Sequence, residues 1–99
     1  MSDARQMSEL YAETERICLD FLLTDLALCF TFAARLKSEL RIGNSDAARK
    51  VLAEAEKGHA TIARFLPRVA DVKPRNEIKR RMNDLRTILD SARRELLQK

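Results

Sequence analysis

The chain is poor in residues that break helices and in large aromatic side chains. Its 99 residues include two glycines, two prolines and no tryptophan, and aromatic residues make up 5% of the chain. Glycine and proline disfavour helix interiors, and aromatic residues are enriched in strands, so these shortages favour long helices. The chain is 45% hydrophobic and 34% charged. That balance is typical of one compact all-α domain and excludes a disordered chain.

Residues for catalysis are also scarce. His59 is the only histidine, and the sequence has no glycine-rich phosphate loop. Cys18 and Cys29 have no candidate base beside them. Eleven residues separate the two cysteines, about 16 Å along a helix, so they cannot form a disulfide within one helix. We expect two reduced, buried thiols in a non-enzymatic protein without a cofactor.

The N-terminus does not resemble a signal peptide, because Asp3, Glu9 and Glu13 interrupt its apolar residues. Residues 17–34 are strongly apolar, but Asp20 and Asp25 would be costly inside a bilayer. We therefore expect a soluble, cytoplasmic protein without a membrane partner.

Two short segments divide the chain into helices. Gly43-Asn44-Ser45-Asp46 predicts one turn, and the stretch from Pro67 to Pro74 contains the second. The helices are expected at about residues 4–41, 46–66 and 75–97 of a single domain, 1–99. Whether Pro67 ends the second helix or only kinks it stays open. The predicted fold is an all-α, three-helix antiparallel bundle with a long first helix.

The first helix carries apolar residues on two sides. One side includes Met7, Leu10, Ile17 and Phe21 and is expected to face the other two helices. The opposite side has no obvious partner within one chain, so it predicts a homodimer, parallel or antiparallel. The expected interface residues are Leu19, Leu23, Leu26, Phe30 and Ala33.

The first hairpin resembles a tetratricopeptide (TPR) repeat. Gly43 would end the first helix, and Ala48, Leu52 and Ala55 recur on the inner face of the second, as small and large apolar residues do in that family. The resemblance covers one partial repeat, about a third of the chain. It implies a TPR-like hairpin followed by a third helix, and a role in protein–protein interaction.

Asp25 and His59 lie on apolar faces at similar distances from the first turn, which predicts a buried polar pair. An alternative adds Glu56, because Glu56-x-x-His59 places two metal ligands on one helix face. Asp25, Glu56 and His59 would then form a ferritin-like metal site in a helical dimer.

The third helix carries a basic flank, and residues 73–99 hold nine basic and four acidic side chains, a net charge of +5. The flank consists of Arg75, Lys79, Arg86 and Arg93. It offers a second alternative, nucleic-acid binding through phosphate contacts. Acidic residues on the other flank and the absence of aromatic residues in this helix disfavour it. The preferred interpretation is a self-associating interaction or scaffold module.

Overall fold

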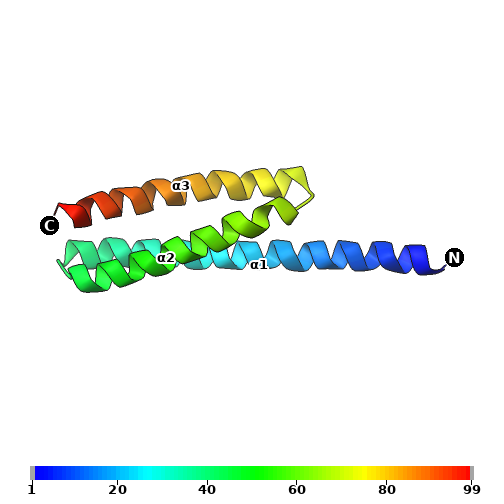
Figure 1. Ribbon diagram of the computed structural model, residues 1–99, viewed down its shortest axis with the longest axis horizontal. Helices are drawn as coiled ribbons and strands as arrows, with labels where there is room; N and C mark the ends of the chain where they lie inside the picture. Colours follow the sequence, from blue (N-terminus) through cyan, green and yellow to red (C-terminus); the bar gives the residue numbers. More distant parts are fainter. Residues whose placement is uncertain (1, 99) are drawn as a thin grey trace.

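The protein is an all-α three-helix bundle, as predicted. The computed structural model describes residues 2–98, which contain three α-helices and no strand. The helices are α1 (Ser2–Arg41), α2 (Ser45–Phe65) and α3 (Val72–Leu97), with a short 3₁₀ helix, η1 (Leu66–Arg68), after α2. Consecutive α-helices run in opposite directions (Figure 1). Both α2 and α3 lie alongside the C-terminal part of α1.

The turn between α1 and α2 depends on a left-handed glycine and a side-chain cap. Gly43 has a φ of +78°, a conformation that costs glycine little and ends α1. The backbone N–H of Asn44 then donates to the carbonyl of Glu39 at 2.9 Å. The Asn44 side chain accepts a hydrogen bond from the N–H of Ala47 at 3.2 Å, which caps α2.

In the second turn, α2 ends before Pro67, and α3 begins earlier than the sequence predicted. The α-helix ends at Phe65, and Pro67 lies at the start of η1, where the first N–H groups of a helix have no partner within it and a proline therefore loses no hydrogen bond. α3 begins at Val72, three residues before the expected position 75. The Asp71 side chain accepts from the N–H of Lys73, and Pro74 fits in the first turn because that turn leaves N–H groups free.

The core is a single apolar cluster shared by the three helices. Gly58 on α2 lies close to α1, because a Cβ atom added there would lie 2.5 Å from the Sγ of Cys29 on α1. Cys29 is buried, and its thiol donates a long hydrogen bond to the carbonyl of Ala55 at 4.0 Å. The residues that α1 contributes to the core are Leu22, Leu26, Cys29, Ala33, Leu36 and Leu40.

The N-terminal part of α1 projects beyond the rest of the bundle. The molecule measures 65 × 19 × 16 Å. α3, with 26 residues, spans about 39 Å, whereas α1, with 40, spans about 60 Å. Figure 1 shows this first part of α1 without a neighbouring helix. We call residues 3–17 the overhang.

Candidate interaction surface

Most of the stripe that the sequence predicted as a dimer interface lies inside the chain. Leu26 and Ala33 are only 0% and 2% exposed and belong to the core. Leu19 and Phe30 are partly buried against the same core. The guanidinium of Arg81 on α3 lies 5.3 Å from the centre of the Phe30 ring. The predicted interface is therefore corrected, because these residues contact the rest of their own chain.

The other apolar side of α1 is the exposed one. We call it the α1 stripe. Its apolar side chains are between 48% (Phe21) and 62% (Ile17) exposed. The spacings of 3, 4, 3, 4 and 7 residues follow a heptad, which keeps the stripe on one side of the helix. Leu23, from the predicted interface, is also exposed but lies on another side of α1. The α1 stripe consists of Met7, Leu10, Thr14, Ile17, Phe21 and Leu28.

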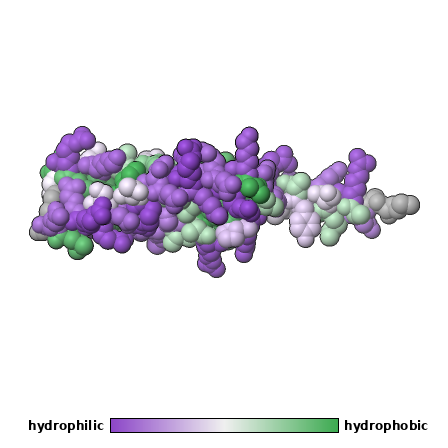
Figure 2. Space-filling view, turned by 90° about the horizontal axis from the view of Figure 1, so that it is seen from above, coloured by the Kyte–Doolittle hydropathy of each residue, from purple (hydrophilic) through white to green (hydrophobic). Residues whose placement is uncertain are grey.

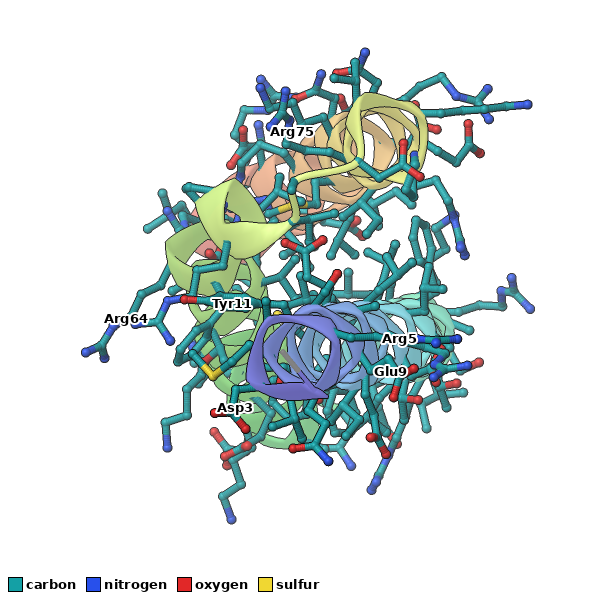
Figure 3. All side chains as sticks on the ribbon, turned by 90° about the vertical axis from the view of Figure 1, so that its right-hand side faces the viewer. Asp3, Arg5, Glu9, Tyr11, Arg64 and Arg75 are labelled. Carbon is teal, nitrogen blue, oxygen red and sulfur yellow. The ribbon has the colours of Figure 1, made fainter. Side chains whose placement is uncertain are left out.

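Most of the stripe lies on the overhang, where no other helix of the chain can cover it. Figure 2 shows hydrophobic side chains among hydrophilic ones along this projecting segment. In the end-on view of Figure 3, Tyr11 points toward the side where α2 lies, and Arg5 and Glu9 point the opposite way. Arg5 and Glu9 form an exposed ion pair at 3.8 Å. The overhang is thus amphipathic, with a charged side and an apolar side.

An aromatic cluster continues the stripe onto the bundle. The rings of Phe21 and Phe65 meet edge to face, with centroids 6.4 Å apart. The guanidinium groups of Arg64 and Arg68 lie 5.6 and 5.0 Å from the centre of the Phe65 ring. The exposed apolar surface therefore passes a basic margin supplied by α2 and η1.

The predicted buried pair of Asp25 and His59 is not formed. Both side chains are only partly buried, and neither hydrogen-bonds to the other within residues 2–98. Asp25 lies close enough to Cys29 to act on its thiol. Burial raises the pKa of Cys29, and the negative charge of Asp25 raises it further. The thiol therefore stays protonated, as suits a packing residue.

Glu56 has a different set of partners from the one that the metal hypothesis requires. It accepts hydrogen bonds from Arg86 Nη1 at 2.8 Å and from Arg93 Nη2 at 2.5 Å. The hydrogen bond from Arg86 lowers the pKa of Glu56 against the opposing effect of burial. Among the described residues, no three histidine, cysteine or acidic side chains are placed to hold a metal ion. Asp25, Glu56 and His59 therefore do not form the alternative site.

The predicted basic flank of α3 is largely engaged within the chain. Arg86 and Arg93 bind Glu56, and Arg86 also donates to Asp90 at 2.9 Å. Arg75 donates to the carbonyl of Val69 at 3.2 Å. Three of the four flank residues thus have intramolecular partners, which leaves fewer free cations for phosphate groups.

The fourth flank residue, Lys79, lines a cavity of about 530 Å³ between α2 and α3. Half of the residues that line it are apolar, and Arg75, His59 and Asn83 are its other polar members. No carboxylate, thiol or hydroxyl group of the described residues lines it. The cavity therefore lacks the paired acid and base, or base and nucleophile, of a hydrolytic centre.

α1 is long and apolar enough to cross a membrane, judged by length and composition alone. A mostly buried core helix of a soluble protein satisfies the same criterion; α1 supplies six residues to the core, and 22% of its apolar window is buried. Asp20 and Asp25 lie within its apolar part and would be costly there.

The lengths of the helices could have predicted from the sequence which apolar side of α1 stays exposed. α2 has 21 residues and starts at residue 45, so it can pair with α1 only back to about residue 20. Met7, Leu10 and Ile17 lie before that point and have no partner in a hairpin of this length. The angle of each stripe around α1 does not show which one is covered, whereas its position along α1 does.

No protein-family model matches this chain, and neither does any curated protein or solved structure in the comparisons.

Proposed function

We propose that this protein is a non-enzymatic helical interaction module that self-associates through the α1 stripe. The observation that carries the proposal is the run of exposed apolar side chains on the overhang. Exposed apolar surface of this size and regularity is typical of an interface. The heptad spacing is typical of one helix packing along another.

The energy available from the stripe is large enough for association. Fully burying a Leu, Ile or Met side chain contributes about 1.5–3 kcal/mol. Met7, Leu10 and Ile17 are 57%, 59% and 62% exposed. Each would therefore contribute roughly 1–2 kcal/mol on becoming buried, twice over in a symmetric dimer. Several such residues can offset the loss of translational and rotational freedom on association.

The proposal includes a soluble, cytoplasmic protein whose first hairpin is TPR-like. Gly43 at the end of α1 and the buried small residues Ala48 and Ala55 on α2 support the likeness. The engaged side chains of Glu56, Arg86 and Arg93 favour an interaction module over the metal-binding and nucleic-acid-binding alternatives.

The test is the oligomeric state of two variants, Ile17→Asp and Leu23→Asp. Ile17 belongs to the stripe, and Leu23 is an exposed leucine outside it. Light scattering after size exclusion, at micromolar protein, should give twice the monomer mass for the wild type and for Leu23→Asp. Ile17→Asp should weaken the dimer by about a hundredfold or more, because two side chains are lost per dimer and two charges are introduced.

Circular dichroism should show the same helix content for both variants, which would exclude unfolding of the bundle as the cause of a lost dimer. A wild-type chain that stays monomeric at these concentrations would overturn the proposal. Equal loss of the dimer in Leu23→Asp and Ile17→Asp would overturn the assignment to the stripe.

A further inference from the structure

We propose that the second copy lies antiparallel, so that each overhang covers the stripe and the basic end of the other bundle. This inference rests on the proposed self-association and adds its direction, its register and the charges that select it. Three observations carry it: the distribution of charge, the contact between the stripe and the basic end of the bundle, and the heptad spacing.

The two ends of the proposed interface carry opposite charge. The overhang holds four acidic and two basic side chains, a net charge of −2. The part of the bundle nearest to it, residues 64–81, holds seven basic and two acidic side chains, a net charge of +5. We call this segment the basic end. An antiparallel pair places each acidic overhang beside the basic end of the other copy, whereas a parallel pair places like charges side by side.

The stripe reaches the basic end directly. Phe21, its fifth member, contacts Phe65 of α2, and Arg64 and Arg68 surround the Phe65 ring. A helix lying along the stripe would therefore pass these two arginines. The acidic overhang of a second copy has the complementary charge for that position, and a second parallel bundle does not.

The heptad spacing selects a register. Thr14 and Phe21 occupy the first position of their heptads, and Leu10 and Ile17 occupy the fourth. In an antiparallel helix pair, a first position of one helix packs in the same layer as a fourth position of the other. Leu10 then packs against Phe21 of the second copy, and Thr14 packs against Ile17 of the second copy. In this register the overhang of one copy covers the exposed stripe of the other copy as far as Leu28, which is 49% exposed. All the large stripe residues near the dimer centre become buried.

Disulfide mapping tests the direction of the pair. Leu10→Cys and Phe21→Cys are made separately in a Cys18→Ala background, carry tags of different mass, and are mixed and oxidised. The antiparallel pair should give the mixed disulfide between the two variants and little disulfide from Leu10→Cys alone. A parallel pair should give the reverse. Leu23→Cys, outside the stripe, is the control and should not cross-link.

The salt dependence of the dimer is a second, independent readout. Attraction between overhang and basic end predicts weaker association as sodium chloride is raised, whereas repulsion between like ends predicts stronger association. Arg68→Glu should weaken the dimer by about threefold, the effect of a charge at the rim of an interface. Arg94→Glu, near the far end of α3, should leave it unchanged.

The outcomes separate this inference from the proposed function. A dimer that forms Leu10 to Leu10 disulfides and tightens with salt would overturn the antiparallel arrangement and leave self-association standing. A monomer that gives no disulfide from any pair would overturn both. Binding of such a monomer to phosphatidylcholine vesicles would assign the stripe to a lipid surface and would also overturn both.

Discussion

Gly58→Ala tests a close approach between α1 and α2. The added Cβ would lie 2.5 Å from Cys29 Sγ, whereas atoms in ordinary contact are about 3.5–4.0 Å apart. One of the helices must shift, or the buried thiol must change its rotamer. Overpacking of this kind costs about 1–3 kcal/mol. The better helix propensity of alanine offsets about 1 kcal/mol, so we expect a net loss of about 0–2 kcal/mol.

A double-mutant cycle isolates the contact from the propensity. Cys29→Ala removes the sulfur atom, so Gly58→Ala should stabilise that background by up to about 1 kcal/mol. The coupling between the two positions is then about 1–3 kcal/mol. Ala53→Gly, at an exposed position of α2, measures propensity alone.

The assay is urea unfolding followed by circular dichroism, at one fixed protein concentration because association adds to stability. If Gly58→Ala has the same effect in both backgrounds, within about 0.5 kcal/mol, the two positions are not in contact. The account of how α1 and α2 approach each other would then be wrong.

Three other substitutions and one control test the bundle, each by urea or thermal unfolding. Leu26→Ala should cost about 2–5 kcal/mol because the side chain is fully buried, whereas the control Leu97→Ala, at an exposed position outside the stripe, should change stability little; equal losses would contradict the core assignment. Glu56→Gln should cost about 1 kcal/mol near neutral pH. The hydrogen bond from Arg86 holds the pKa of Glu56 below its usual value, so this stability is present above the unfolded-state pKa and is lost as the pH falls through the folded-state pKa. A wild type and variant that differ equally at all acidic pH values would refute this linkage. Gly43→Ala should cost about 1 kcal/mol because of the positive φ, with no contribution from crowding.

Much of the fold could be predicted from local chemistry. The composition predicted an all-α chain, and the glycine turn at residue 43 separated the first two helices correctly. Six apolar residues of α3 follow one narrow stripe and are buried, namely Ile78, Met82, Leu85, Leu89, Ala92 and Leu96, and Ile88 beside them is partly buried. The predicted start of α3, residue 75, lies three residues after the observed one, because the side chain of Asp71 caps the helix and it begins at Val72.

The candidate sites were harder to predict because each needs a partner from another helix. Glu56-x-x-His59 has the spacing of a metal motif, but nothing in that segment shows that Arg86 and Arg93 of α3 face Glu56. Asp25 was expected to be buried because its neighbours are apolar. It lies at the edge of the helix contact and stays partly exposed.

The sequence by itself determined that this protein is helical, where its first turn lies, and that α1 has more apolar surface than one neighbour requires. Those properties follow from helix propensity, glycine conformation and spacing along one helix. Only the tertiary structure decided which side of α1 is free. That choice depends on where α2 and α3 lie around α1 and on how far they reach along it. They cover Leu26 and Ala33 and leave Met7, Leu10 and Ile17 exposed.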